Sequence, residues 1–301
     1  MISIVKSRKI WFLISGVMIG ISIVSIIIWN LNFGIDFTGG SLMEISFKES
    51  LPKTDEVTKL LTDSGLVKNP SVQLLGDKGM ILRFTSVSEE DHQKILTALQ
   101  DAYKENISED KFDSIGPTIG EELKQKTFWA LILAAIGIIL YIAWSFRAVS
   151  RPVSSWNYGI IANIALLHDV LIAVGAFSIL GKFYGIEINS PFIAALLTIM
   201  GYSVNDTIVV FDRIRENLIK SYKGNLGEII DKSINETIAR SINTNTTVLL
   251  VLIAIFFFGG STMRDFTLAL IIGVTVGTYS SIFIASPLLI VFDDWSKKRK
   301  K

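Results

Sequence analysis

Hydrophobic residues in this chain are gathered into long stretches rather than spread evenly among the polar ones. Four runs without a charged residue cover positions 10–29, 128–146, 241–263 and 266–292. Two more runs, at 158–180 and 190–211, are interrupted only by His168, Asp169 and Asp206. An α-helix needs roughly 20 residues to cross ~30 Å of hydrocarbon. The pattern therefore predicts an α-helical membrane protein with six transmembrane helices.

Residues 31–127 separate the first two runs and show a different pattern, in which short strands and helices alternate. Alternating positions and turn signals predict strands at 41–48, 71–75, 80–85 and 112–115. Thr54 and Ser88 each begin a short amphipathic helix, and residues 76–79 predict a hairpin turn. The order βαββαβ is that of a ferredoxin-like α+β sandwich. Its carboxylates are scattered among lysines, as on an ordinary solvated surface, so no catalysis is expected there.

Residues 212–240, after the fourth run, are too polar to span a membrane. Within them, apolar residues recur every four positions beside lysines and glutamates: Leu226, Ile230, Ile234 and Ile238. This spacing predicts an amphipathic helix with one apolar face. The helix could lie at the membrane interface or dock on a partner, and the pattern leaves both interpretations open.

Lysine and arginine are concentrated on one side of the predicted membrane. Sixteen lie in the N-terminus, the turn after the second helix, the segment after the fourth helix and the tail. The alternate loops, at 181–189 and 259–265, hold only Lys182 and Arg264. Positive residues are retained on the cytoplasmic side during insertion. We therefore expect both termini to be cytoplasmic. The expected domains are a cytoplasmic N-terminus with a retained first helix (1–30), an extracytoplasmic domain (31–127), five further helices with the cytoplasmic segment (128–292) and a basic tail (293–301).

Composition excludes several classes of chemistry. The chain of 301 residues has a net charge of +1, two histidines and no cysteine. Disulfides and thiolate chemistry are therefore excluded, and neither a metal, a cofactor nor a nucleic acid is expected. The phosphate-binding pattern GxxxxGK[ST] is absent from the sequence, so any ATP hydrolysis would belong to a partner.

Ionisable residues inside the predicted helices are the strongest functional candidates, because a charged side chain at the bilayer centre costs at least ~2.5 kcal/mol. Counting from the outer end of each helix at ~1.5 Å per residue places Asp169 at roughly 16 Å, Asp206 at roughly 22 Å and Arg240 at roughly 28 Å. The three form a staircase of ionisable groups, with Arg240 about one helical turn further toward the cytoplasm than Asp206. We expect Asp206 to be functional, because a carboxylate at such depth is seldom retained without use.

Polar residues accompany the three candidates on the same helices: Ser203, Asn205, Asn243, Thr244, Thr247 and His168. They could line a hydrated path for protons. Hydroxyl and amide groups also hold transmembrane helices together, and His168 could simply bond a neighbouring carbonyl, so both interpretations remain open.

Small residues recur every four positions in the first and last helices. Gly16 and Gly20 form a GxxxG pair, and the last helix has the series Gly273, Gly277, Ser281 and Ala285. Such stripes let helix backbones approach closely, so they predict packing contacts. The sequence does not say whether the partner helices belong to this chain or another.

Several motifs together resemble the SecF family of the bacterial Sec protein-export machinery, over nearly the whole chain. The most specific passage is residues 201–217, GYSVNDTIVVFDRIREN. The others are GPTIG at 116–120, HDV at 168–170, RSINT at 240–244, GTYSS at 277–281 and, after the first helix, Phe33-Gly34-Ile35-Asp36-Phe37-Thr38-Gly39-Gly40. Asn245 departs from the serine expected in many relatives.

The resemblance implies a function beyond what spacing shows. It implies half of an RND-like unit in the bacterial cytoplasmic membrane, acting with SecD, the SecYEG channel and a preprotein to couple proton flow to late translocation. It also implies proton conduction through Asp206 and Arg240, with Asp169 in support, and an outer domain that assists the emerging preprotein. The alternative, an RND-type small-molecule exporter, is disfavoured because one small outer domain leaves little room for a ligand pocket. A purely structural scaffold is the third class.

Overall fold

The computed structural model describes residues 3–147, 154–220 and 225–299. It divides into two compact units, one formed by Met1–Asn32 with Trp129–Lys301 and the other by Phe33–Phe128. Six helical segments in the described part are long and apolar enough to cross a membrane, which confirms the six-helix prediction. They are Arg8–Trp29, Pro117–Ser145, Ser155–Tyr184, Ser190–Lys220, Leu226–Phe258 and Met263–Lys298.

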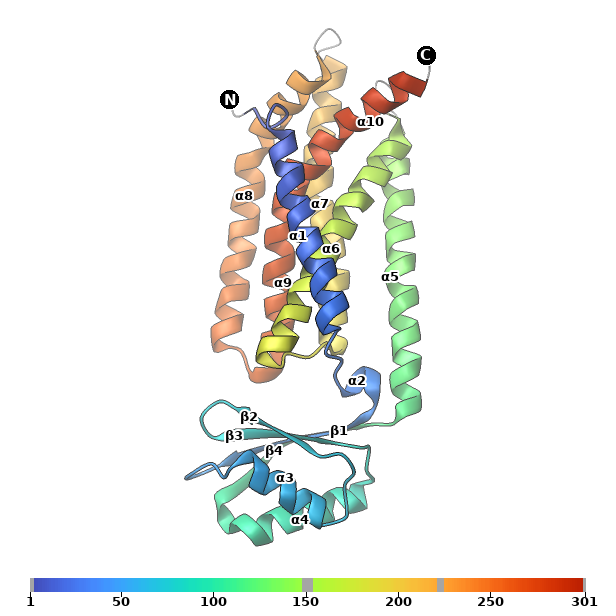
Figure 1. Cartoon of the computed structure of the whole chain (residues 1–301). Helices are drawn as coiled ribbons and strands as arrows, with labels where there is room; N and C mark the ends of the chain where they lie inside the picture. Colours follow the sequence, from blue (N-terminus) through green and yellow to red (C-terminus); the bar gives the residue numbers. More distant parts are fainter. Residues whose placement is uncertain (1–2, 148–153, 221–224, 300–301) are drawn as a thin grey trace. The chain divides into compact units, whose positions relative to one another are not determined.

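The first five of these segments are the helices α1, α5, α6, α7 and α8 (Figure 1). The sixth consists of α9 (Ser261–Ser280), one π-helical stretch, η2 (Ser281–Ala285), and α10 (Ser286–Arg299). Pro287 lies just after η2 and has no backbone N–H to donate within the helix. The last membrane segment is therefore continuous in sequence but irregular in its hydrogen bonding.

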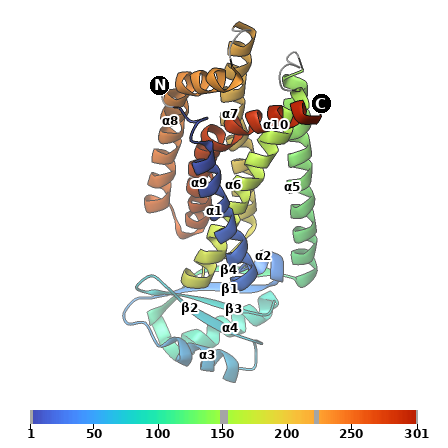
Figure 2. The same cartoon turned by 45° about the horizontal axis from the view of Figure 1, so that its top comes forward.

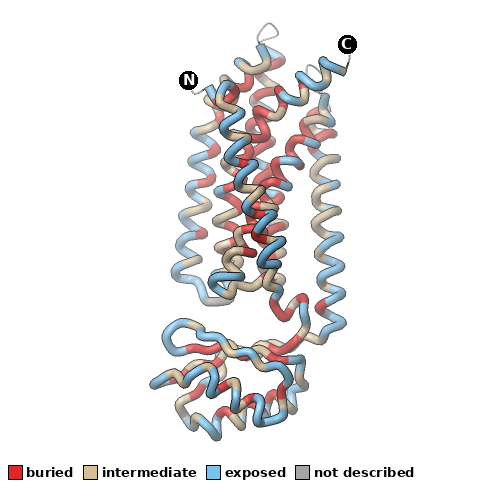
Figure 3. Tube along the Cα trace, viewed as in Figure 1, coloured by how far each residue is buried: buried red, intermediate tan, exposed pale blue. Residues whose placement is uncertain are grey.

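Three helices form the centre of this unit. In the membrane-spanning windows of α6 and of the α9 segment 61% of the residues are buried, and in α7 50%. The corresponding share is 17% for α1 and α8 and 11% for α5, whose traces are mostly exposed or intermediate in Figure 3. Exposed leucine, isoleucine and phenylalanine on these three helices are the side chains that a lipid environment would cover.

The apolar stripe at the start of α8 packs inside its own chain, which neither sequence interpretation anticipated. Ile230 and Ile234 are fully buried in the main hydrophobic cluster, and Leu226 and Ile238 pack against it. The N-terminal residues lie beside the same part of α8 (Figure 2). The Val5 backbone N–H donates to Oδ1 of Asp231 at 2.9 Å, and the Ser3 hydroxyl to Oδ2 at 2.9 Å.

Glycines mark the closest helix contacts. A Cβ at Gly273 would lie 2.3 Å from Ile199 of α7, and one at Gly277 would lie 3.1 Å from Cβ of Ser203. The small-residue stripe of the last segment thus packs on α7 of the same chain. By contrast, a Cβ at Gly16 or Gly20 in α1 would meet no described atom within 4 Å. The GxxxG pair is therefore not used for a contact among the described residues.

The second unit is a four-stranded antiparallel sheet with the order β2-β3-β1-β4. Its elements are α2 (Ile35–Thr38), β1 (Gly40–Phe47), α3 (Thr54–Asp63), β2 (Ser71–Leu75), β3 (Gly79–Phe84), α4 (Glu89–Tyr103), η1 (Lys104–Asn106) and β4 (Ile107–Ile115). Inward residues of the strands and of α3 and α4 share one core, which includes Met43, Val57 and Ile95. Order and topology match the predicted ferredoxin-like sandwich.

Two details of this unit refine the prediction. Ser88 caps α4 as expected, because its hydroxyl accepts a hydrogen bond from the backbone N–H of Asp91 at 3.2 Å. The last strand starts at Ile107 rather than near Phe112, and the second membrane helix starts at Pro117, well before residue 128. Proline is favoured at the first position of a helix, since the N–H it lacks would have no helical partner there.

Candidate functional site

Asp169 of α6 lies at the centre of the helical unit and is fully buried. Its Oδ1 lies 2.8 Å from Nδ1 of His168, and its Oδ2 accepts hydrogen bonds from the hydroxyls of Ser203 on α7 and Ser280 on α9. A buried carboxyl group needs such partners, because its transfer from water without them costs several kcal/mol, of order 2–7. The three central helices therefore meet at this one carboxyl group.

A chain of hydrogen bonds continues from His168 to α1. Nε2 of His168 lies 3.1 Å from the Ser15 hydroxyl, which donates to the Tyr279 hydroxyl at 3.1 Å. Tyr279 in turn donates to the backbone oxygen of Trp11 at 3.0 Å. With both hydroxyl protons used in this way, Ser15 accepts from Nε2–H of His168. One proton must then lie between Nδ1 of His168 and Oδ1 of Asp169, and either residue can carry it.

Asp206 faces α8 and has a separate environment. Its side chain is 7% exposed, and its Oδ2 accepts a hydrogen bond from Nδ2 of Asn245 at 2.7 Å. Oδ1 of the same Asn245 accepts from the hydroxyl of Tyr202 at 2.6 Å. Tyr202 and Asp206 are four residues apart on α7, so they lie on one face of that helix. The amide of Asn245 joins them from the neighbouring helix.

Arg240 makes no direct contact of the kind that Asn245 makes with Asp206 among the described residues. None of the ion pairs among residues 3–147, 154–220 and 225–299 joins these two side chains, and Arg240 is exposed on α8. Asn245, five residues further along α8, provides the hydrogen bond to Asp206. The electrostatic role of Arg240 from about one helical turn away stays a prediction.

The remaining predicted residues fall into two groups. Ser203 and His168 bond to Asp169, so they belong to the buried cluster rather than to Asp206. Four others are exposed on the outer faces of α7 and α8: Asn205, Asn243, Thr244 and Thr247. The Thr247 hydroxyl bonds to its own helix, at the Thr244 carbonyl oxygen 2.7 Å away.

Four contact residues were missed by the sequence interpretation as partners of the carboxylates: Ser15, Tyr279, Ser280 and Asn245. A signal for Ser15 exists, since the serines of α1, Ser15, Ser22 and Ser25, interrupt an otherwise apolar run and are all buried. Tyr279 and Ser280 lie in the conspicuous passage GTYSS. Asn245 was noticed as one of the polar residues of its helix and as a departure from the family pattern, but not as the partner of Asp206.

The motif after α1 has a structural explanation in the second unit. Gly39 has φ +71°, and a Cβ there would lie 2.8 Å from Cα of Pro117. Gly40 has φ +129°, and a Cβ there would lie 2.9 Å from the carbonyl oxygen of Phe84. Only glycine fits both positions without strain. In the rest of the motif Asp36 is half-buried, Phe37 is buried and the Thr38 hydroxyl donates to the Gly34 carbonyl oxygen at 3.0 Å.

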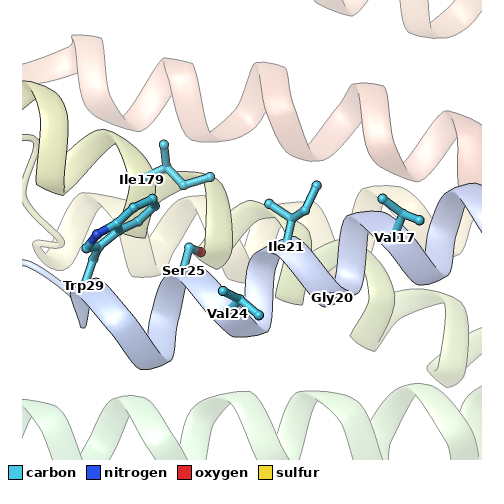
Figure 4. A pocket seen from close by; sticks show the side chains of 7 residues that line it. All are labelled: Val17, Gly20, Ile21, Val24, Ser25, Trp29 and Ile179. Carbon is cyan, nitrogen blue, oxygen red and sulfur yellow. The ribbon is translucent and has the colours of Figure 1, made fainter.

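A groove of about 370 Å³ between α1 and α6 is apolar (Figure 4). It is lined by Val17, Gly20, Ile21, Val24, Ser25, Trp29 and Ile179. Its one hydroxyl, Ser25, donates to the backbone oxygens of Ser22 and Gly175. The groove offers no charged group to a ligand and is separate from both aspartates.

Comparison with known proteins agrees with the sequence motifs. The chain matches the family model "Protein export membrane protein SecD/SecF, C-terminal" over residues 94–295 and the "SecD/SecF GG Motif" over residues 31–50. It is 41% identical to protein translocase subunit SecF of Thermobaculum terrenum, covering 98% of this chain and 95% of that one. The SecF of Anaerolinea thermophila is 37% identical, with 100% and 99% covered.

Solved structures show the same fold. The crystal structure of SecDF from Thermus thermophilus, described as a translocon-associated membrane protein, matches with a TM-score of 0.84 and 30% identity over 98% of this chain. A second SecDF structure, in a super-membrane-facing form, matches with a TM-score of 0.66. This chain spans 39% and 38% of the length of those two SecDF chains. From its motifs, its fold and its full-length relatives, the chain belongs to the SecF family of protein translocase subunits.

Proposed function

We propose that this SecF-family chain acts with SecD to couple inward proton flow to late steps of preprotein translocation through the SecYEG channel. The observation that carries the proposal is the pair of carboxyl groups, Asp169 and Asp206, within membrane-spanning helices and with hydrogen-bond donors in place. Ionisable residues at such depth are costly, so they are typically found where protons or ions pass.

A SecD partner is supported by an exposed stripe on α7. Residues of small or polar type face outward at helical spacing on the same helix as Asp206: Ala194, Thr198, Gly201 and Asn205. Exposed polar groups on α8, among them Asn243 and Thr244, lie on the neighbouring helix. Lipid does not satisfy such groups, whereas a second six-helix half packed on the stripe would.

We place the chain in the bacterial cytoplasmic membrane with both termini inside and the ferredoxin-like unit outside. The lysine and arginine distribution favours this orientation. The contacts of Ser3 and Val5 with Asp231 support it further, because they hold the N-terminus beside the start of α8. Ser3, Val5 and the start of α8 therefore lie at the same end of the helical unit.

In this proposal the chain is a transport subunit and not an enzyme. Asp206 is the main proton carrier, Asp169 a second proton-binding group, and Arg240 a cation that acts from the next turns of α8. The exporter alternative needs a site for a small molecule. The groove along α1 is apolar and lies apart from the aspartates, so it gives that alternative no support.

The test of proton coupling is preprotein transport into inverted vesicles containing the whole translocase, with and without a proton gradient. Asp206→Asn keeps the size of the side chain but removes the titrating group, so the gradient-dependent stimulation should disappear. Asp212→Asn is the matched control, because Asp212 is exposed on the same helix and pairs with Arg215 at 2.8 Å. Full stimulation in Asp206→Asn at equal membrane abundance would refute the proposed role.

The test of the partner is copurification from native membranes. Gly201→Leu on the α7 stripe should prevent SecD from copurifying, because a large side chain separates close helix backbones. Gly16→Leu on α1 is the control of equal size, since a side chain there meets no described atom within 4 Å. Equal recovery of SecD with both variants would place the partner elsewhere.

A further inference from the structure

We infer that Asn245 is a positioning residue for Asp206. Its amide, oriented by the Tyr202 hydroxyl, determines which protonation state of this carboxyl group is stabilised, and it couples that state to the contact between α7 and α8. The inference rests on the proposed function and deepens it. It depends on two contacts, Asn245 Nδ2 to Asp206 Oδ2 at 2.7 Å and Tyr202 hydroxyl to Asn245 Oδ1 at 2.6 Å.

The direction of the two hydrogen bonds follows from the donors available. A tyrosine hydroxyl that donates to Oδ1 leaves the NH₂ group of Asn245 facing Asp206. An N–H can stabilise an ionised carboxylate, and it has no lone pair to accept a proton from a neutral carboxyl. In the observed arrangement Asn245 therefore offers Asp206 a donor and no acceptor.

Protonation of Asp206 reverses the pattern. A neutral carboxyl group becomes a donor and needs an acceptor, which Oδ1 of Asn245 provides after the amide turns over. The NH₂ group then faces the oxygen of Tyr202, which can accept. The Tyr202 hydroxyl hydrogen then no longer has Oδ1 of Asn245 as its acceptor. The amide thus has one orientation for each protonation state of Asp206, and the turned orientation gives up the hydrogen bond that Tyr202 donates.

Burial makes this contact decisive for Asp206. Asn245 is 3% exposed and Asp206 7% exposed, so water does not readily replace the amide. Among the titratable and charged groups on the elements around Asp206, Tyr202 on α7 bonds to this amide itself. The others include Arg240 on α8, His168 and Asp169 on α6, and Arg264, Asp265 and Tyr279 on α9.

Because Asn245 lies on α8 and Asp206 on α7, the amide also connects proton binding to the contact between two helices. Reorientation exchanges a charged hydrogen bond for a neutral one across this contact. Hydrogen bonds to charged groups are stronger than those between neutral groups. The attraction between α7 and α8 therefore weakens when the proton binds.

The experiment is an infrared titration of the purified full-length chain, following the C=O band that disappears in Asp206→Asn. Asn245→Leu keeps the side-chain size and removes the N–H donor, so the midpoint pH should rise by about one unit. Tyr202→Phe should raise it in the same direction but less. In the double variant the tyrosine substitution should add nothing, because without the amide the hydroxyl has no route to Asp206.

Thr246→Val is the matched control, since Thr246 is the exposed neighbour of Asn245 on α8. It should leave the midpoint unchanged. An unchanged midpoint in Asn245→Leu, or additive effects of the two substitutions, would overturn the inference. A merely structural role predicts reduced thermal stability without a shifted midpoint, and that result would overturn it as well.

The titration also separates this inference from the proposed function. It reads the protonation of Asp206 without any transport. A shifted midpoint in Asn245→Leu, together with unchanged gradient-dependent transport in Asp206→Asn, would refute the proposed function and support the positioning role. Loss of gradient-dependent transport in Asp206→Asn, together with an unchanged midpoint in Asn245→Leu, would support the proposed function and refute the positioning role. The pH profile of transport should shift upward by the same amount in Asn245→Leu if both are correct.

Discussion

The hydroxyl of Ser280 donates to Oδ2 of Asp169 at 2.8 Å, and the helix departs from α-helical geometry at the very next residue, where η2 begins. Single π-helical stretches inside α-helices often occur at functional sites. The Ser286 hydroxyl bonds to the Ser281 carbonyl oxygen at 2.9 Å, which satisfies one of the carbonyls in this stretch. The buried carboxyl group is thus tied to the irregular part of the last membrane segment.

Removal of the hydrogen bond between Ser280 and Asp169 should reduce the stability of the last membrane segment. Ser280→Ala deletes one interhelical hydrogen bond in the membrane, and we expect a loss of stability of about 1 kcal/mol. The measurement is unfolding of the detergent-solubilised chain in increasing SDS. Thr275→Ala is the control, because Thr275 is exposed on α9 and bonds only to its own helix, at Ile271. Equal losses in the two variants would contradict the special role of the Asp169 contact.

The glycine pair after α1 should be intolerant of any side chain. Gly39→Ala combines a left-handed backbone with a Cβ 2.8 Å from Pro117, so we expect a cost of about 2–4 kcal/mol. Gly76→Ala separates the two causes, because Gly76 also has positive φ but no described atom within 4 Å of its Cβ position. Hydrogen exchange of β1 in the full chain measures both variants. A smaller cost at position 39 than at 76 would show that the Pro117 contact is unimportant.

The outer face of α4 should contribute to stability only above mildly acidic pH. Hydrogen bonds from Gln93 and then from His92 hold the pKa of Glu89 below its ordinary value of 4.5. A carboxyl group with a lowered pKa in the folded state stabilises that state above its unfolded pKa, and this contribution is lost as pH falls through the folded value.

Glu89→Gln should therefore increase hydrogen exchange of α4 relative to the parent chain at pH 7, and the difference should shrink as the pH falls below about 4.5. Comparison of variant and parent at each pH cancels the intrinsic pH dependence of exchange. Asp77→Asn, in the turn between β2 and β3, is the control and should leave α4 unchanged. A difference that grows towards low pH would have the wrong sign for this account.

The orientation can be tested with single cysteines, because the chain contains none. A membrane-impermeant maleimide added outside intact cells should label Asp77→Cys in the ferredoxin-like unit. It should not label Lys298→Cys near the end of α10 until the membrane is opened, since positive segments remain inside. Labelling of position 298 from outside would reverse the proposed topology.

The elements of the fold could be read from the sequence because each has its own strong local signal. Runs of about twenty apolar residues identify the helices, and alternation with glycine-rich turns identifies the strands. Ser88 caps α4 through its own side chain, so its signal is local and sufficient. The early start of α5 at Pro117 escaped notice because its first turns are polar and lie outside the apolar run.

The contacts of the candidate site could not be read in the same way. Asp169 and Asp206 stand out as charges in apolar runs, but their partners come from other helices. The rotation that brings Asn245 to Asp206 is decided by packing. Helix α6 is apolar on nearly all sides, so periodicity gives it no preferred face. The amphipathic start of α8 has such a face, yet its period does not say whether lipid, a partner or the chain's own core covers it.

The position of α1 has a consequence for the order of synthesis. This helix leaves the ribosome before the other five, but Ser25 contacts Gly175 and the residues before the helix contact Asp231, and Gly175 and Asp231 are both made much later. During most of translation α1 therefore resides in the bilayer without the neighbours it will finally have. It is also the most hydrophobic of the six segments. Its entry into the membrane is accordingly driven by its own composition, and its docking is a late step that waits for α6 and α8.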